Sequence, residues 1–469
     1  MGVAGWNAFM TQEFRALENR AAEWESEALD LLTELVQFHT VAPRDQEGLT
    51  GCAEFLRDAF KQRGYSSATY VKGGAPVVYA EKNVGARKTL LFYHHYDVQP
   101  EGNLDLWHSS PWELVKRGGR VYGRGTSDDK GPLVSSMMGV ELIEDVLGKV
   151  PVNVHFVVEG EEEAGSMALP NFAKDKAEFL KADGCVWEGV GAIPGSPGEV
   201  VCGLKGDAYF DLVTVGVPHF ARTDAHSGDA GAVPNAAWRL VWALSTLKAP
   251  DETITLDGFR EAVRKPLQED LDALRDYQGD AVTRFKHEYG LDRLLAGREG
   301  LELLKALFLD PQMTISGLTS GYQGPEDMTI VPAAASAKVD IRTVPDLTVD
   351  KLEKMLRAHL DARGFSDIRI VRKPGYEPAK TPVSDPFIKL MHGIMKEACA
   401  PAGTGVVPMA QGSGPAFLFA QHAPLCMAYS YADIEGTDCH APNENMKLQS
   451  LPGSMAVVAA IAERLAGTD

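Results

Sequence analysis

Histidines and acidic residues gather in three short clusters in the first third of the chain. The clusters are His95-Tyr96-Asp97, the glycine-rich segment Gly123–Gly131, and the segment Glu159–Ser166, whose first five residues include four glutamates. Each cluster alone is also typical of a solvated turn. Imidazole nitrogens and carboxylate oxygens are, however, the ligands that catalytic divalent ions bind in many hydrolases. The clusters therefore suggest metal-dependent chemistry if the fold brings them together.

The first cluster has the spacing of a metal ligand followed by an acid that orients it. Side chains alternate along extended backbone, so His95 and Asp97 are expected to point to one side and His94 to the other. A carboxylate commonly binds the second ring nitrogen of a metal-bound histidine and so fixes its tautomer. A polar strand end without any function would show the same three residues.

The glycine-rich cluster carries adjacent carboxylates at Asp128 and Asp129. A phosphate-binding loop is disfavoured, because Asp128 replaces the third glycine of the GxGxxG pattern and two carboxylates would repel a phosphate. Two interpretations remain. The segment is either a solvated acidic turn or backbone that its glycines shape to present a carboxylate.

The third cluster follows the apolar run Val152–Val158, as His95 follows the run Thr89–Tyr93. Both runs are rich in branched and aromatic residues and are predicted to be strands buried on two faces. In open α/β sheets, ligands bind at the carboxyl ends of the strands. His95 and the pair Glu162–Glu163 are therefore expected to converge.

Two residues farther along complete a set of ligands. Glu188 follows the apolar stretch Gly184–Trp187, and His440 lies in the segment Asp438–Glu444. With the earlier clusters they supply two histidines and three carboxylates, a set that suits a pair of divalent ions about 3.5–4 Å apart sharing one carboxylate. No cysteine belongs to this set, which disfavours a structural zinc site.

The elements that must position these residues alternate between helix and strand in the first part of the chain. Helical spacing predicts helices over about residues 11–38 and over 131–147, beside the two buried strands. This alternation indicates an α/β domain with a mostly parallel sheet.

After about residue 206 the pattern changes. Residues 208–215 and 337–343 alternate as half-buried strands do, with helical segments that include a charged stretch at 251–307 between them. Long helices and a short strand at 423–428 then return. We expect one domain inserted into another: a catalytic domain in two parts, 1–206 and 382–469, and an inserted α+β domain at 207–381.

The composition is that of a soluble globular protein. The 469 residues carry 46 lysines and arginines against 65 aspartates and glutamates, a net charge of −19, so no nucleic-acid partner is expected. The sequence contains no apolar run of about 18 residues, so no membrane-spanning helix is expected. The six cysteines are widely spaced without a CxxC pair, and residues 1–19 lack the blocks of a signal peptide, which favours a cytoplasmic location.

Taken together, these motifs make the sequence similar to the M20 family of metallopeptidases, and most similar to its dipeptidase branch with the carnosine-type dipeptidases. The similarity runs in order from about residue 30 to about residue 460. The segments that carry it are Tyr93–Pro100, Gly123–Gly131, Glu159–Ser166, Asp224–Gly228 and Ile341–Pro345. The resemblance implies a catalytic domain of the zinc-peptidase type, with the inserted domain serving as a lid and dimerisation domain.

The resemblance also implies two divalent ions per chain, most often zinc, with manganese or cobalt as alternatives. One ion would be held by His95, Asp128 and Glu188, and the other by Asp128, Glu163 and His440, so that Asp128 is the bridge. Glu162 would be the general base and Asp97 would orient His95. Two ions that bridge a water lower its pKa to around 7, so that hydroxide forms at neutral pH and Glu162 accepts its proton.

Three residues are expected to contact the substrate. The resemblance implies that His226 polarises the scissile carbonyl from the inserted domain, reaching the metals of a partner subunit in a homodimer. Arg342 would bind the terminal carboxylate, for which a planar guanidinium is well suited. Ser413 lies where dipeptidases carry the motif Arg-x-Gly-Gly-Ser-Ile-Pro, whose Arg is absent here. His94, in turn, stands where those enzymes have a glycine.

Three functions are compatible with these residues. The leading hypothesis is a two-metal hydrolase that cleaves dipeptides or short peptides through the bridging hydroxide. The same site also suits an N-acyl-amino-acid deacylase or desuccinylase with a different acyl pocket. The third is a catalytically silent metal-binding scaffold. The presence of Glu162 and of all five ligands counts against this third function. A serine nucleophile at Ser413 is disfavoured, because the GxSxG elbow is incomplete there.

Overall fold

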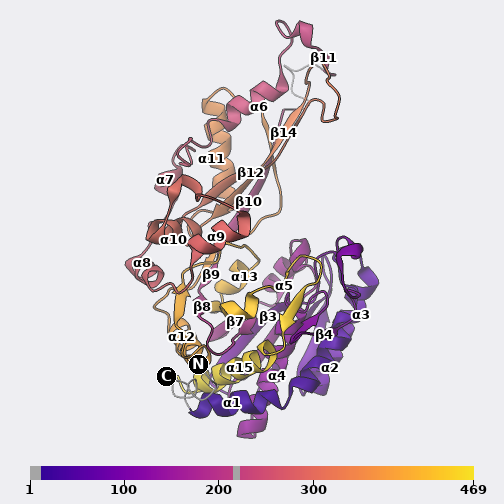
Figure 1. The fold of residues 1–469 in the computed structure, drawn as a ribbon, viewed down its shortest axis with the longest axis vertical. Helices are drawn as coiled ribbons and strands as arrows, with labels where there is room; N and C mark the ends of the chain where they lie inside the picture. The colour runs from indigo at the N-terminus through magenta and orange to yellow at the C-terminus, as the bar shows by residue number, and fades with distance from the viewer. Residues whose placement is uncertain (1–11, 215–221, 469) are drawn as a thin grey trace.

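The computed structural model describes residues 12–214 and 222–468 of the chain. The described part consists of two bodies arranged along the long axis (Figure 1). The larger body holds an eight-stranded sheet and the second holds a four-stranded sheet. The described residues exclude 1–11, 215–221 and 469. The first of these ranges contains most of the N-terminal segment 1–19 and the start of the predicted first helix. The second contains the last residue of the strand predicted at 208–215.

The eight-stranded sheet has the order β1-β2-β6-β3-β7-β18-β8-β17. Four of its seven neighbouring pairs run parallel, which confirms the predicted mostly parallel sheet. Its strands are β1 (Ser66–Tyr70), β2 (Val77–Lys82), β3 (Thr89–His95), β6 (Asn153–Glu159), β7 (Gly184–Gly191), β8 (Gly198–Val201), β17 (Thr404–Val407) and β18 (Leu425–Ser430). Strands β3 and β6 correspond to the two predicted apolar runs.

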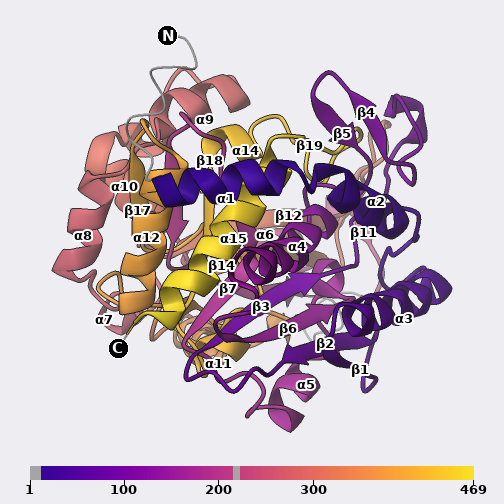
Figure 2. The ribbon, with the colours of Figure 1, turned by 90° about the horizontal axis from the view of Figure 1, so that it is seen from below.

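Helices cover both faces of this sheet. The larger cluster of buried residues joins one face to α1 (Gln12–Ala22), α2 (Glu25–Val36), α3 (Gln46–Gln62), α4 (Lys130–Leu147), α12 (Pro386–Ala398) and α15 (Ser450–Ala466). A view from below shows α1, α4 and α15 in front of the sheet (Figure 2). The other face packs on α5 (Leu169–Asp175) and α13 (Phe417–Ala420). The hydrophobic interior of the larger body thus lies on both sides of the strands that carry the predicted site.

The predicted first helix is two helices rather than one. Residues Glu23 and Trp24 form a turn between α1 and α2, in which their N–H groups bond to the carbonyls of Arg20 and Ala21. The break has a packing reason: α1 lies mainly on α15, whereas α2 packs on α4. Apolar spacing along the chain does not reveal this change of partner.

The second body is built on an antiparallel sheet with the order β12-β14-β10-β15. Its strands are β10 (Gly206–Val213), β12 (Gln312–Ser320), β14 (Ala335–Thr343) and β15 (Arg369–Arg372). The alternating burial of β10 and β14 confirms the predicted half-buried strands. Buried residues of this sheet pack against α6 (Ala236–Leu244), α7 (Phe259–Ala262) and α11 (Val349–Ala362).

The charged stretch between the two predicted strands forms α8 (Gln268–Arg275), α9 (Ala281–Tyr289) and α10 (Gly300–Phe308). At the far tip of the second body, β11 (Ala225–His226) pairs with β13 (Ile330–Val331) (Figure 1). Among the described residues, no helix combines the length and apolar character needed to cross a bilayer.

Candidate metal centre

The candidate site lies where neighbouring strands of the large sheet end. Strand β3 runs parallel to both β6 and β7, and His95 at the end of β3 is level with Glu159 at the end of β6. A short turn, η3 (Glu162–Ala164), follows β6 directly. Glu188 lies within β7, which continues beyond the predicted apolar stretch. The parallel register therefore brings the three segments to one edge, as the sequence predicts for ligands at carboxyl ends.

Asp97 connects the first cluster to the third. One of its carboxylate oxygens accepts a hydrogen bond from the backbone N–H of Glu162 and the other from that of Glu163, each at 3.0 Å. Its carbonyl oxygen lies 3.0 Å from His95 Nδ1, whereas its carboxylate is 3.6 Å from that nitrogen. Asp97 is fully buried. One residue thus fixes both the ring of His95 and the turn that carries the two glutamates.

Asp128 lies between the two histidines. Its Oδ1 is 3.0 Å from His95 Nε2, and its Oδ2 is 2.9 Å from His440 Nε2. Glu163 Oε1 lies 3.2 Å from the same nitrogen of His440. Each histidine therefore contacts a different oxygen of one carboxylate, which is the placement that a bridging ligand requires.

The loop that presents Asp128 is held by Glu444, a residue that the sequence analysis did not single out. The buried carboxylate of Glu444 accepts hydrogen bonds from the backbone N–H groups of Gly125, Ser127 and Asp128 at 2.9–3.1 Å. It also pairs with Arg124 at 2.9 Å. Gly125 has a φ of +86°, where glycine is favoured. Backbone shaped to present a carboxylate, one of the two interpretations above, describes this loop.

A strand pairing brings His440 to the same place. Strand β19 (Asn445–Lys447) pairs with β5 (Arg120–Tyr122), which in turn pairs with β4 (Val115–Arg117). Strand β19 follows His440 in the chain, and strand β5 precedes the Asp128 loop. Two segments that are 312 residues apart in sequence thus meet at Asp128.

A second pair missed by sequence reasoning, His94 and Asp129, lies behind the ligands. Asp129 Oδ2 is 2.8 Å from His94 Nδ1 and accepts a hydrogen bond from the backbone N–H of His95 at 3.1 Å. The other ring nitrogen of His94 lies 2.9 Å from Ser136 Oγ. The imidazole of His94 therefore holds the carboxylate of Asp129, which in turn binds the backbone N–H of His95.

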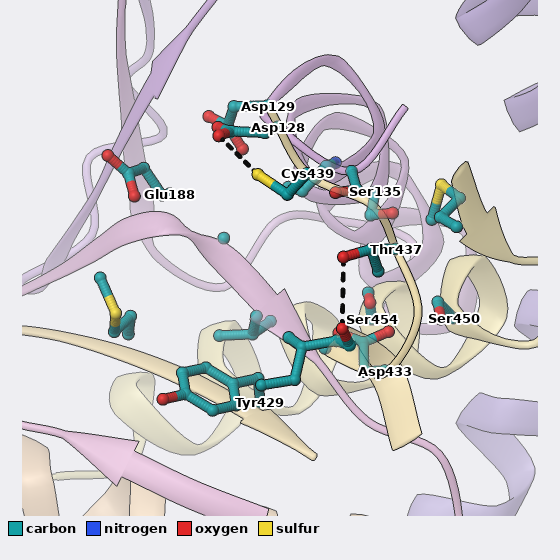
Figure 3. A pocket seen from close by; sticks show the side chains of 18 of the residues that line it. Asp128, Asp129, Ser135, Glu188, Tyr429, Asp433, Thr437, Cys439, Ser450 and Ser454 are labelled. Atoms are coloured by element: carbon teal, nitrogen blue, oxygen red, sulfur yellow. Dashed lines mark hydrogen bonds between the residues drawn. The ribbon is translucent and has the colours of Figure 1, made fainter. Parts of the chain in front are cut away.

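Cys439 also reaches the site. Its thiol donates to Asp128 Oδ2 at 3.1 Å, as the close view shows (Figure 3). One donor atom each from Asp128, Cys439 and His440 lie within 4.8 Å of one another. Cys439 is exposed, whereas the other five cysteines are buried. The motif around His440 contains this cysteine, but only the structure shows that it faces Asp128.

The acids of the centre crowd one another in a largely buried space. Burial raises the pKa of Glu162 to about 8, and burial together with the charge of Glu162 raises the pKa of Glu188. Burial opposes ionisation of Asp128 too, but hydrogen bonds from His440 and His95 hold its pKa well below the usual range. Asp128 in turn raises the pKa of His440 to about 12. Positive charge at this point therefore favours the ionised carboxylates.

The donor set fits a pair of divalent ions. The imidazoles of His95 and His440 and the carboxylates of Asp128 and Glu163 contact one another, and the buried Oε1 of Glu163 lies 3.2 Å from His440 Nε2. The charges of His95 and Asp128 also act on the buried carboxyl group of Glu188. Gln99 Nε2 donates to the other oxygen of Glu163 at 2.6 Å, which fixes its orientation. Oriented oxygen and nitrogen donors around a shared carboxylate are what a two-metal site requires.

Arg342 and Ser413 lie together beside the centre. Arg342, on β14, donates from Nη1 to Ser413 Oγ at 2.8 Å. A Cβ added to the next residue, Gly414, would lie 3.4 Å from Glu162 Oε1. Two residues predicted to contact the substrate thus lie next to the predicted general base, although they come from different bodies of the molecule.

His226 is not brought to this centre within the chain. It is exposed in β11, at the tip of the second body and remote from β3 and β7 (Figure 1). Its Nδ1 accepts a hydrogen bond from the backbone N–H of Gly228 at 3.0 Å, so Nε2 is the nitrogen that remains to act on a substrate.

Comparison with known proteins identifies the family. Residues 91–464 match peptidase family M20/M25/M40, and the chain belongs to this family. The M20 family metallo-carboxypeptidase Sso-CP2 from Sulfolobus solfataricus has a similar structure, with a TM-score of 0.85 and 30% identity over 94% of this chain and 100% of that one. The resemblance to M20 metallopeptidases, and the fold class it implies, are thereby confirmed.

Two curated relatives are named as dipeptidases. The Cys-Gly metallodipeptidase dug1 of Schizosaccharomyces pombe is 31% identical over 283 residues, which are 59% of this chain and 58% of that protein. The Beta-Ala-His dipeptidase of Rattus norvegicus is 31% identical over 299 residues, which are 61% of this chain and 58% of that protein. The match therefore spans a little over half the length of each of these relatives.

Proposed function

We propose that this protein is a metal-dependent hydrolase that cleaves dipeptides or short peptides. The observation that carries the proposal is the position of Asp128 between His95 and His440, with Glu162 beside the pair Arg342–Ser413. The names of the two dipeptidase relatives support the same substrate class.

In this proposal His95, Asp128 and Glu188 hold one divalent ion, and Asp128, Glu163 and His440 hold the other. The ions would supply Lewis-acid activation of the attacking water and of the scissile carbonyl. We propose zinc as the resident ion, with manganese or cobalt as alternatives. The proposed ligands are imidazoles and carboxylates, which suit all three ions.

The chain's own residues then perform three tasks. Glu162 takes the proton of the attacking water and passes it to the leaving amine. The carboxylate of Asp97 holds Glu162 in place by accepting a hydrogen bond from the backbone N–H of Glu162, and the carbonyl oxygen of Asp97 orients the ring of His95. Arg342 and Ser413 bind the carboxylate at the end of the substrate, since a guanidinium and a hydroxyl both donate to carboxylate oxygens.

The proposal includes a homodimer in which His226 completes the partner's site. The inserted domain (207–381) divides the catalytic domain into parts 1–206 and 382–469. The inserted domain exposes Trp238 and Trp242 on α6, at 57% and 54%, and Ile315 and Leu318 on the edge strand β12. A large exposed apolar surface and an unpaired strand edge are features that subunit contacts commonly cover. The His226 position supports the same arrangement, because a partner is then needed to bring this residue to a metal centre.

A turnover assay tests the function. Protein loaded with zinc, manganese or cobalt is assayed against dipeptides and against N-acyl amino acids, including N-succinyl ones. We expect hydrolysis of dipeptides. Turnover of N-acyl amino acids alone would favour a deacylase or desuccinylase, and metal binding without any turnover would favour a silent scaffold.

A further inference from the structure

A side pocket opens next to the candidate metal centre. It has a volume of about 280 Å³ and lies between β7, β18, the segment 433–439 and the first turns of α4 and α15 (Figure 3). Asp128, Glu188 and Cys439 line both this pocket and the metal centre. A group that enters the pocket therefore lies directly beside the place where the reaction would occur.

The pocket contains polar groups that are not among the proposed metal ligands. Ser135, on α4, is 2% exposed, and its hydroxyl has no hydrogen-bond partner among the described residues. The carboxylate of Asp433 lies against β7, since a Cβ added to Gly191 would be 1.6 Å from Asp433 Oδ2. Ser450 and Ser454 add hydroxyls from α15. An unpartnered buried hydroxyl in a pocket that also contains a carboxylate favours a polar ligand.

The charge of the pocket indicates that this ligand carries a positive charge. The charged residues that line it are Asp128, Asp129, Glu188 and Asp433, and all four are acidic. Asp128 and Glu188 are assigned to the ions, and Asp129 is bound by His94. Asp433 is neither a proposed ligand nor bound by a histidine. Burial raises its pKa, whereas the hydroxyl of Ser450, which also lines the pocket, and Lys447, which lies outside the lining, lower that pKa. The walls also include Met427, Tyr429 and Ile434, which suit an aliphatic stem.

The position of the pocket indicates which part of a substrate reaches it. The proposed carboxylate-binding pair, Arg342 and Ser413, does not line the pocket. If that pair binds the carboxylate of a dipeptide, the first residue of the dipeptide lies on the other side of the scissile bond and needs a binding site of its own. The first residue is therefore the part that extends along Glu188 into the pocket.

We propose that the side pocket binds the cationic side chain of the first residue of a dipeptide, with Asp433 as the partner of its charge. The protein then prefers dipeptides that begin with lysine or a similar basic residue over neutral ones of equal length. This inference rests on the proposed function and specifies its substrate class. The aliphatic stem lies on Met427 and Ile434, and the ammonium group donates to Asp433 and to the hydroxyl of Ser135.

The test compares Lys-Ala with norleucine-Ala, whose side chain has a similar length but no charge. We expect wild-type kcat/KM to be at least about tenfold higher for Lys-Ala, as for a buried charge pair. Asp433→Asn should remove this preference by lowering kcat/KM for Lys-Ala while norleucine-Ala is unchanged. Asp433→Glu, which keeps the carboxylate, should retain part of the preference.

The matched control is Glu435→Gln, which makes the same change of charge two residues away on a side chain that is 78% exposed. It should leave the preference intact. Equal turnover of both peptides by wild type, or equal losses on both in Asp433→Asn, overturns the inference while the peptidase proposal stands. If Asp433→Asn does not fold, Thr437→Lys places a competing ammonium in the pocket and should also abolish the preference.

A binding measurement separates this inference from the proposed function. Calorimetry on zinc-loaded Glu162→Gln, with and without Asp433→Asn, gives the affinity for each peptide in the absence of turnover. Tighter binding of Lys-Ala that depends on Asp433 supports the pocket even if no dipeptide is hydrolysed. Equal affinities for the two peptides overturn it.

Discussion

Glu162 and Glu163 are adjacent in sequence but differ in their surroundings. Glu163 contacts His440 and Gln99, whereas Glu162 lies beside Gly414, close to the predicted substrate carboxylate. This difference supports the division of roles into a ligand and a general base. It also makes the two roles separable by substitution.

Glu162→Gln should remove the proton acceptor and leave all five ligands in place. We expect kcat to fall by at least about 10²-fold, as general-base losses do, with about two metal ions per chain still bound. Steady-state kinetics and elemental analysis of the same preparation check both parts. Loss of metal from this variant would mean that Glu162 and Glu163 exchange roles, and Glu163→Gln serves as the comparison.

Arg342→Ala should matter only for substrates with a free terminal carboxylate. Removing one partner of a close charge pair typically costs at least about 2 kcal/mol, so kcat/KM for dipeptides should fall at least about 30-fold. The matching dipeptide amides should be affected far less. Arg342 also lies 3.5 Å from Asp340, and equal losses on both substrates would assign it to that structural pair instead.

At the scale of the elements, the Asp128 loop depends on a single carboxylate. Glu444→Ala leaves Arg124 buried without its partner and frees three backbone N–H groups. We expect the free energy of unfolding to fall by about 3–5 kcal/mol, as when one member of a buried ion pair is removed. Urea denaturation measures this loss. The exposed Glu435→Ala serves as the control and should change stability by less than about 1 kcal/mol.

The same loop marks what the sequence does and does not predict. Strand ends are visible in the sequence, so the convergence of His95 with Glu162 and Glu163 follows from two apolar runs and the rule for parallel sheets. Glu444 acts on a loop 316 residues away, and no local pattern connects them. The turn at Trp24 likewise depends on which helix each segment packs against.

At the scale of the whole molecule, the proposed dimer makes a distinctive prediction. His226→Ala and Glu162→Gln should each be nearly inactive alone. After subunit exchange at equal mixing, half of the dimers are mixed and one of their two sites has both wild-type groups. Activity should therefore recover to roughly a quarter of wild type, as a two-fold symmetric dimer requires.

The control for this experiment is proof of exchange, for example by isolating mixed dimers through two different affinity tags. Wild type mixed with each variant gives the expected scale of activity. Isolated mixed dimers that remain inactive would place His226 outside the partner's site. A monomer in solution would contradict the dimer itself.

The order of the strands also has a consequence for biosynthesis. Strand β18, at residues 425–430, lies between β7 and β8, which are complete by residue 201. At about 5–20 residues per second, translation leaves the edge of β7 without its neighbour for about 10–45 s. His440 and Glu444 emerge later still. A nascent chain therefore has an open central sheet while the second body is being made, and the proposed metal centre cannot assemble before the segment that carries His440 and Glu444 leaves the ribosome.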